Sequence, residues 1–265
     1  MAFVGTSGWS YASWRPKFYP AEVKPAKFLA HYAERLRTVE VNYTFNHLPT
    51  ADTAAKWLAQ TAPDFLFALK ASQRITHFDR LRNPAETTPR FLDSARLLGT
   101  RLGPILFQTP PTFRRDDDIL AGFLAEIPHD VRFAVEFRHE SWYVPATLDL
   151  LGARGVPLVH AEGERAPSPL DTIGASGAFA YVRLRAAAGY DAAALGAWTG
   201  RLAPLLAAGR DVYAYFRHDD DGANGLAALA LRDALGPSPL TSSVPEPGGD
   251  IPAAPGLEAG PRSVR

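Results

Sequence analysis

The stretch RFAVEFRHESW, residues 132–142, decides the fold because its charges fall on one face of an otherwise apolar strand. Side chains alternate between the two faces of a β-strand. One face carries bulky apolar residues: Phe133, Val135 and Phe137. The other face changes from a small residue to charged ones: Ala134, Glu136 and Arg138. An isolated buried charge is costly, so we expect the second face to look into a polar pocket.

Two further stretches repeat this pattern. TVEVNY (38–43) turns Glu40 and Asn42 to one face, and FLFALK (65–70) ends with Lys70. In each stretch one face is bulky, as packing against outer helices requires, and the other becomes polar toward its C-terminal end. The interior of a (β/α)8 barrel has this character, because its functional groups lie at the C-terminal mouth.

Strand-like and helix-like segments alternate along most of the chain. We expect strands at residues 2–7, 38–43, 65–70, 104–109, 132–137, 157–161, 179–184 and 211–216. We expect helices near residues 25–36, 51–61, 88–99, 117–126, 146–154, 191–207 and 222–235. This alternation predicts an α/β fold, a TIM-barrel-like (β/α)8 barrel of parallel strands with outer helices. An open doubly wound sheet is the alternative, but GTSGWS (5–10) lacks the third glycine of a dinucleotide-binding turn.

The end of the chain differs in composition from the rest. Residues 236–265 carry 7 Pro and 5 Gly in 30 residues and no aromatic residue. Such a segment cannot bury enough apolar surface to offset the entropy of ordering it. We therefore expect one barrel domain over residues 1–235 and a disordered tail over residues 236–265.

Charge and composition narrow the classes of function. Lys plus Arg and Asp plus Glu number 28 each, so no overall basic field favours nucleic acid or an anionic membrane. The chain has no cysteine, which excludes thiolate metal sites and cysteine nucleophiles. No run approaches the roughly 18 apolar residues of a membrane span, and the N-terminus does not resemble a signal peptide. We expect a soluble cytoplasmic protein with no membrane partner, and nucleic acid is disfavoured.

Polar side chains gather where the predicted strands end. The catalytic candidates are Glu40, Lys70, Glu136 and Arg138. The substrate-binding candidates are Ser7, Trp9, Asn42, Gln108, Trp142, Arg183 and His218. The competing interpretation is that the four catalytic candidates form a structural ion-pair network. If Glu136 belongs to a site, Glu136→Gln should lower the free energy of unfolding by under about 1 kcal/mol. A structural network predicts a loss of roughly 3–5 kcal/mol.

Five motifs, taken in order along the chain, resemble the YecE-like family, domain of unknown function 72. They are GTSGWSYASWRPKFYP (5–20), TVEVNYTFNHLP (38–49), FLFALKASQRITH (65–77), GPILFQTPPTF (103–113) and VEFRHESW (135–142). The resemblance implies a TIM-barrel-like fold and no known reaction. It adds His77 to the substrate-binding candidates. Its polar signature falls on Ser7, Gly8, Trp9, Tyr11, Trp14, Glu40, Asn42, Lys70, Thr76, His77, Gln108, Pro110, Glu136, Arg138 and Trp142.

Two positions depart from the family pattern. The family usually has Arg-x-His-Gly at the end of the seventh strand, where this chain has Arg183 to Ala186 with Arg185 in place of the histidine. The last strand usually ends in Phe-Asn-Asn, where this chain has Phe216, Arg217 and His218. An altered or lost activity would follow if these positions do chemistry, and His218 is a candidate to replace the missing histidine.

The residue types favour several chemistries. Glu40 and Glu136 suggest general acid/base catalysis across the mouth, as in glycoside hydrolysis. Lys70 and Arg138 favour an anionic ligand, and Arg183 lies near the usual phosphate site of such barrels. For Lys70, an ion pair with a glutamate competes with a role as a Schiff-base nucleophile.

We therefore expect an enzyme of hydrolase, isomerase or lyase type that acts on a small anionic or sugar-like molecule, with a phosphorylated or sugar-like ligand as its partner. The first alternative is a non-catalytic binding protein. The second is a metal-dependent nuclease-like barrel, with a divalent metal held by Glu40, Glu136, His139 and His160. No metal ligand is assigned and the cofactor stays unknown. Trp9 and Trp142 are candidates for stacking on a sugar or base, whereas Trp14, Phe18 and Tyr19 are expected to form a hydrophobic lid over the first helix.

Overall fold

Eight parallel strands form the centre of the molecule. The computed structural model describes residues 1–162 and 168–236. The strands in this part of the chain are β1 (Ala2–Thr6), β2 (Thr38–Val41), β3 (Leu66–Lys70), β4 (Leu102–Gln108), β5 (Phe133–Glu136), β6 (His160–Ala161), β7 (Phe179–Leu184) and β8 (Asp211–Phe216). All eight predicted strands are confirmed, and every strand pair runs parallel.

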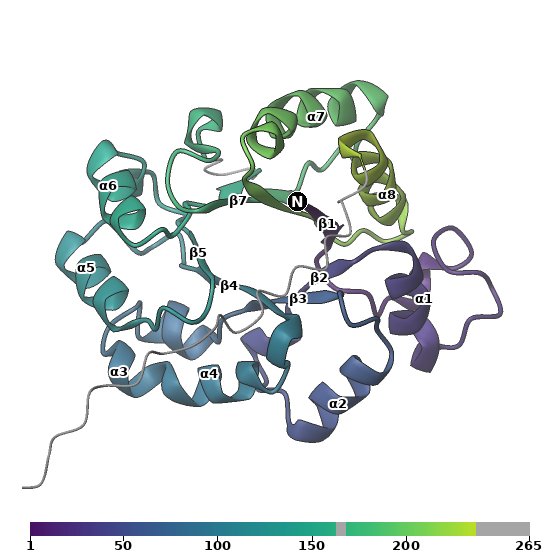
Figure 1. Cartoon of the computed structure of the whole chain (residues 1–265), viewed down its shortest axis with the longest axis horizontal. Helices are drawn as coiled ribbons and strands as arrows, with labels where there is room; N and C mark the ends of the chain where they lie inside the picture. The colour runs from purple at the N-terminus through teal and green to yellow at the C-terminus, as the bar shows by residue number, and fades with distance from the viewer. Residues whose placement is uncertain (163–167, 237–265) are drawn as a thin grey trace, which may run out of the picture.

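Helices surround the strands on the outside (Figure 1). They are α1 (Phe28–Arg35), α2 (Ala51–Ala59), α3 (Pro84–Thr87), α4 (Pro89–Arg96), α5 (Asp117–Glu126), α6 (Pro145–Ala153), α7 (Ala192–Ala207) and α8 (Ala223–Leu235). The caps explain several starts: Thr50, Asp116 and Asp191 each accept a backbone N–H of the first turn. The predicted helix near 88–99 is shorter than expected, because α4 ends at Arg96 and a separate turn follows.

The strands close into a barrel from two four-stranded sheets. One sheet has the order β1-β8-β7-β6 and the other β2-β3-β4-β5. Single bridges join their edges, Ser7 to Glu40 on one side and Val135 to Leu158 on the other. The TIM-barrel-like arrangement predicted from the alternation is therefore confirmed. Its C-terminal strand ends, with the loops that follow them, are called the mouth below.

Gly5 of β1 lies where the barrel closes against β2. A Cβ on this residue would lie 2.2 Å from the backbone oxygen of Thr38, so any side chain would push the two strands apart. We expect Gly5→Ala to lower the free energy of unfolding by about 1–3 kcal/mol, as overpacking does, in urea denaturation. The control is Gly122→Ala in α5, where an added Cβ meets nothing within 4 Å. Equal stability of the two variants would contradict the tight closure.

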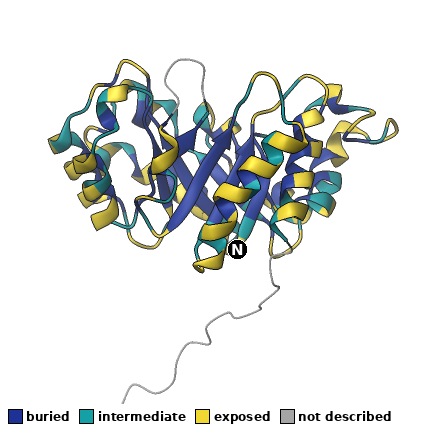
Figure 2. Cartoon of the chain, turned by 90° about the horizontal axis from the view of Figure 1, so that it is seen from above, coloured by how far each residue is buried: buried dark blue, intermediate teal, exposed yellow. Residues whose placement is uncertain are grey.

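Two apolar layers hold the barrel, one outside the strands and one inside. Phe133, Val135 and Phe137 belong to the outer layer that packs under the helices. The inner layer consists of Phe3, Ala68, Leu106, Ala134, Val159, Phe179, Tyr181, Tyr213 and Tyr215. The strands are buried whereas the helices expose their outer sides (Figure 2). The two faces expected for residues 132–137 are thus confirmed, and Glu136 lies on the inner face beyond Ala134.

The loop after β1 is packed as expected. Trp14, Phe18 and Tyr19 are buried in the outer layer, and the Tyr19 ring stacks on Phe28 of α1 at a centroid distance of 4.3 Å. The expected hydrophobic lid over the first helix is therefore confirmed. The expected tail falls outside the described residues from residue 237 onward.

Candidate functional site

Arg183, near the end of β7, joins two carboxylates inside the barrel. Its Nη2 donates to Oε1 of Glu40 at 2.8 Å, and its Nη1 donates to Oε2 of Glu136 at 2.6 Å. Each of the three side chains is at most 2% exposed. We call Glu40, Arg183 and Glu136 the buried triad. It spans the barrel from β2 to β5 just below the mouth.

Neighbouring side chains donate further hydrogen bonds to the two carboxylates of the buried triad. Glu40 accepts from Ser7 Oγ at 2.7 Å and from the Tyr181 hydroxyl at 2.8 Å. Glu136 accepts from Arg138 Nε at 2.9 Å. Buried charges are tolerated only with such geometry and additional hydrogen bonds. The triad therefore has the properties of a structural ion-pair network.

The charges of the triad stabilise one another. Burial alone would raise the pKa of Glu136, but Arg183 and Arg138 outweigh it and hold this pKa at about 2. For Glu40, burial is likewise outweighed, chiefly by Arg183, and its pKa lies below the usual value. Burial would lower the pKa of Arg183, but the two carboxylates raise it. Both glutamates are therefore ionised at neutral pH and neither holds a proton to donate.

This geometry corrects two expectations from the sequence. Arg183 does not offer its terminal nitrogens to a ligand phosphate, because both donate to the triad carboxylates. Lys70 does not pair with a glutamate in the described residues, and Arg183 holds the central position instead. General acid/base catalysis by Glu40 and Glu136 gains no support, because both are buried against donors. Arg138 bridges from the triad to the mouth, with its side chain 36% exposed.

Two cationic side chains above the triad have no such partners. Lys70 and Arg185 make no side-chain hydrogen bond or ion pair within residues 1–162 and 168–236. The Lys70 Nζ lies 4.0 Å from the centre of the Phe45 ring. Burial, followed by the charge of Arg183, lowers the pKa of Lys70 to about 8 and that of Arg185 to about 10. Lys70 is the last residue of β3 and Arg185 follows Arg183 by two residues just after β7, so both lie at the mouth next to the triad.

Glu162 fixes the loop that carries Arg185. Its Oε2 accepts the backbone N–H of Arg185 at 2.8 Å and that of Ala186 at 3.2 Å, and it also accepts from the Tyr190 hydroxyl. Its Oε1 accepts from the indole of Trp198 at 3.1 Å. These bonds hold the start of the β7–α7 loop in place and thereby fix the backbone position of Arg185.

Three other candidates lie around the mouth. His77, in the π-helix Arg74–Phe78, shares a 2.9 Å hydrogen bond with Thr76 and contacts Phe45 edge to face. Burial and the charges of Lys70 and Arg138 lower the pKa of His77, which favours its neutral form. Gln108 is buried and donates to the Thr109 carbonyl at 3.3 Å. Asn42 is half-buried directly after β2.

The aromatic candidates are placed differently from one another. Trp142 is fully buried, stacks on Phe137 at 3.9 Å and donates its indole N–H to the Phe113 carbonyl. The expectation that it stacks on a ligand is wrong, because no face of the indole is accessible. Trp9 is half-buried and meets Trp57 of α2 edge to face. His218 is exposed and stacks on Tyr11 at 4.9 Å.

A hollow of about 350 Å³ lies beside the mouth, between the loops that follow β7 and β8. Its walls include Tyr190, Arg217 and His218. Phosphate in TIM barrels often binds near such loops at a helix N-terminus. Here Asp219 occupies that position, because its carboxylate accepts the N–H groups of Gly222 at 2.7 Å and Asn224 at 2.5 Å. An anionic ligand would meet a carboxylate there, which favours the centre of the mouth over this hollow.

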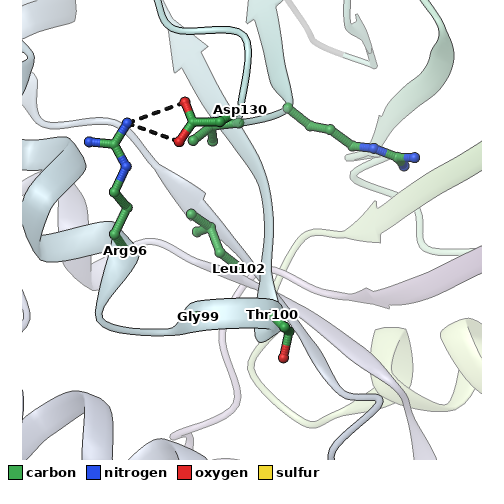
Figure 3. A pocket seen from close by; sticks show the side chains of 7 residues that line it. Arg96, Gly99, Thr100, Leu102 and Asp130 are labelled. Atoms are coloured by element: carbon green, nitrogen blue, oxygen red, sulfur yellow. Dashed lines mark hydrogen bonds and ion pairs between the residues drawn. The ribbon is translucent and has the colours of Figure 1, made fainter. Parts of the chain in front are cut away.

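A second hollow, of about 390 Å³, lies at the opposite end of the barrel, where β4 begins at Leu102. Figure 3 shows the side chains that line it. The ion pair between Arg96 and Asp130 borders it, with Nη2 at 3.1 Å and 3.2 Å from the two carboxylate oxygens. The N-terminal end of TIM barrels serves stability and not catalysis. We therefore place the candidate site at the mouth.

The alternative metal site does not assemble. Within residues 1–162 and 168–236, no three His, Asp or Glu side chains cluster as metal ligands would. His160 lies against the Trp198 ring, and its Nδ1 contacts the Pro169 carbonyl at 3.3 Å. Its imidazole is therefore engaged by residues outside the mouth. In the same residues, no helix has the length and apolar character needed to cross a membrane.

Comparison with known proteins gives one family. The family described as "Protein of unknown function DUF72" matches residues 3–249. The chain is 30% identical over 144 residues to the UPF0759 protein YecE of Escherichia coli K12, covering 54% of this chain and 50% of YecE. It is 29% identical over 168 residues to the UPF0759 protein YunF of Bacillus subtilis, covering 58% of each. The chain thus spans about half the length of the curated relatives it matches.

Solved structures show the same fold. A DUF72 family protein from Thermotoga maritima has a TM-score of 0.76 and 26% identity, over 89% of this chain and 99% of that one. A DUF72 family protein from Enterococcus faecalis has a TM-score of 0.72 and 18% identity, over 90% of this chain and 96% of that one. The second likeness concerns the fold alone.

Proposed function

We propose, from the premise that this chain belongs to the DUF72 family, that the mouth of its barrel binds a small anionic molecule that carries a phosphate or a carboxylate. The observation that carries the proposal is the pair of half-buried cations, Lys70 and Arg185, without a hydrogen bond or ion pair in the described residues. Desolvated cations are costly without a partner. A bound anion would supply that partner.

The charge balance around the mouth supports an anion and not a cation. Lys70, Arg138 and Arg185 lie above the buried triad, whose own two carboxylates are already engaged with Arg183. Arginine binds phosphate and carboxylate groups through paired donors in a fixed plane. The Arg138 side chain is 36% exposed, and its Nε donates a hydrogen bond to Glu136. In the described residues, its other N–H groups are therefore free to donate to a ligand.

We further propose that the bound anion is a substrate, for a reaction of hydrolase, isomerase or lyase type. Lys70 and His77 support this extension, because burial is the main cause that lowers both pKa values, to about 8 for Lys70, and both side chains can transfer protons. The second candidate is a non-catalytic binding protein on the same scaffold. The engagement of Glu40 and Glu136 in the triad favours that candidate, since the two carboxylates offer no acid/base pair.

Calorimetric titration tests the anion site. We expect inorganic phosphate and glycerol phosphate to bind and uncharged glycerol not to bind. Arg185→Met should weaken phosphate binding at least about tenfold, which corresponds to about 1.4 kcal/mol for one lost charged contact.

Arg96→Met serves as the matched control, because Arg96 pairs with Asp130 at the far end of the barrel. It should bind phosphate as the wild type does. Unaltered phosphate binding in both Arg185→Met and Lys70→Met would refute an anion site at the mouth.

A further inference from the structure

Lys70 occupies an unusual place among the lysines of the chain. The five lysines are Lys17, Lys24, Lys27, Lys56 and Lys70, and the first four are exposed. Only Lys70 is partly buried. The Thr44 hydroxyl donates to its backbone carbonyl at 2.6 Å, which fixes the end of β3, and the Phe45 ring lies against its Nζ.

We propose that Lys70 forms an imine with the carbonyl carbon of a small oxo compound whose phosphate or carboxylate is held by Arg138 and Arg185. This inference rests on the proposed anion site. The amine has no competing hydrogen bond in the described residues. Arg138 lies two residues after Glu136 and binds it, and Arg185 lies two residues after Arg183, so both arginines lie at the same end of the barrel as Lys70, the last residue of β3. One ligand can therefore meet both kinds of group at once: the arginines bind its anionic end and Lys70 meets its carbonyl carbon.

The surroundings of Lys70 favour the free amine that such a reaction needs. Burial is the main cause of the lowered pKa of Lys70, and the charges of Arg183 and Arg138 lower it further. Glu40 and Glu136 act in the opposite direction but do not cancel these effects. At pH 7 a pKa of about 8 in place of 10.5 raises the free-amine fraction roughly 300-fold.

The proton transfers can pass through His77, because its imidazole contacts the same Phe45 ring that lies against the Lys70 Nζ. The Nζ lone pair forms the C–N bond while the carbonyl π electrons move to oxygen, which takes a proton from solvent and gives a carbinolamine. His77 accepts the proton that the nitrogen loses. It returns a proton to the hydroxyl, the C–O bond breaks, and one water leaves as the C=N bond forms. The positive charge of the protonated imine then lies near Glu40 and Glu136, where the ammonium lay.

Reductive trapping tests the inference on the full chain. The protein is incubated with glycolaldehyde phosphate and sodium cyanoborohydride at pH 7, and the adducts are located by peptide mapping. We expect Lys70 to be modified at least tenfold faster than any of the four exposed lysines. Uncharged glycolaldehyde should lose this selectivity, because nothing anchors it to the arginines.

Three variants separate the possible causes. Lys70→Met should show no adduct at residue 70 and unchanged slow labelling elsewhere, and Lys56→Met should be trapped at Lys70 as the wild type is. His77→Asn should slow trapping at Lys70 at pH 7. Equal labelling of all five lysines, with phosphate still bound at the mouth, would overturn the imine and leave the anion site standing. Selective trapping that is the same with glycolaldehyde would instead overturn the anion site.

Discussion

Replacing Arg183 by methionine is expected to lower the free energy of unfolding by about 3–5 kcal/mol at pH 7, the cost of leaving buried charges unpaired. The loss follows from geometry, because Arg183 is the only side chain that bonds both Glu40 and Glu136 in the described residues. Chemical denaturation with urea measures it. If the variant does not fold at neutral pH, far-UV circular dichroism at lower pH should recover part of the fold as the carboxylates take up protons.

Arg185→Met is the matched control for this prediction. Arg185 lies two residues further along the same face and has no bonded partner for its guanidinium in the described residues. Its loss should leave the stability unchanged or slightly higher. A triple variant with Glu40→Gln, Glu136→Gln and Arg183→Met should be more stable than Arg183→Met alone, because no member of the triad is then left as an unpaired buried charge. Similar stability of Arg183→Met and wild type would show that the triad does not hold the barrel.

Most of the fold could be predicted from the alternation of apolar and polar side chains between the two faces of each strand. Phe133, Val135 and Phe137 lie under the helices, and Glu136 lies inside, as a period of two requires. This pattern is local, so one sequence suffices to read it. It does not fix strand length: β6 is reduced to His160–Ala161, and only a single bridge at Leu158 extends its pairing. Pro157 lacks an N–H and limits that strand.

The partners of the charges could not be predicted in the same way. Lys70 and Arg183 both lie on the inner face, so the pattern alone cannot tell which of them meets Glu40. Register decides it: Glu40 pairs with Ala68 of β3, and Lys70 lies two residues beyond that level toward the mouth. Register depends on long-range pairing, which a single sequence does not specify.

Arg185 departs from the family pattern, and the sequence does not assign it to the site. The same alternation could have found it, because residue 185 falls on the face of Arg183. Glu162 had no comparable signal, since its carboxylate binds backbone N–H groups of a loop 23 residues away in sequence. The prediction for Trp142 was wrong for another reason. A tryptophan that follows a strand can pack in the core or stack on a ligand, and only the observed stacking on Phe137 distinguishes these two roles.

Replacing Glu136 by glutamine is expected to lower the stability at pH 7 by on the order of 3 kcal/mol, because the folded protein holds the pKa of Glu136 at about 2 against an ordinary 4.5. This agrees with the structural interpretation of the charges in residues 132–142 and not with a site that tolerates glutamine. The amide keeps one acceptor for Arg183 or Arg138, but the charge that both guanidinium groups face is lost.

The pH dependence of stability provides a sharper test of the comparison between wild type and Glu136→Gln. A depressed carboxyl pKa stabilises the fold fully above the unfolded pKa, and this contribution is lost as the pH falls through the folded pKa. The difference in the free energy of unfolding between wild type and Glu136→Gln should therefore shrink from pH 4.5 toward pH 2. We expect it to be roughly 1.5 kcal/mol at pH 3. Glu22→Gln, at an exposed position, should stay within about 0.5 kcal/mol of wild type throughout. A difference that is constant between pH 7 and pH 3 would mean that glutamine acts through shape and packing, and that the Glu136 carboxylate does not stabilise the barrel by its charge.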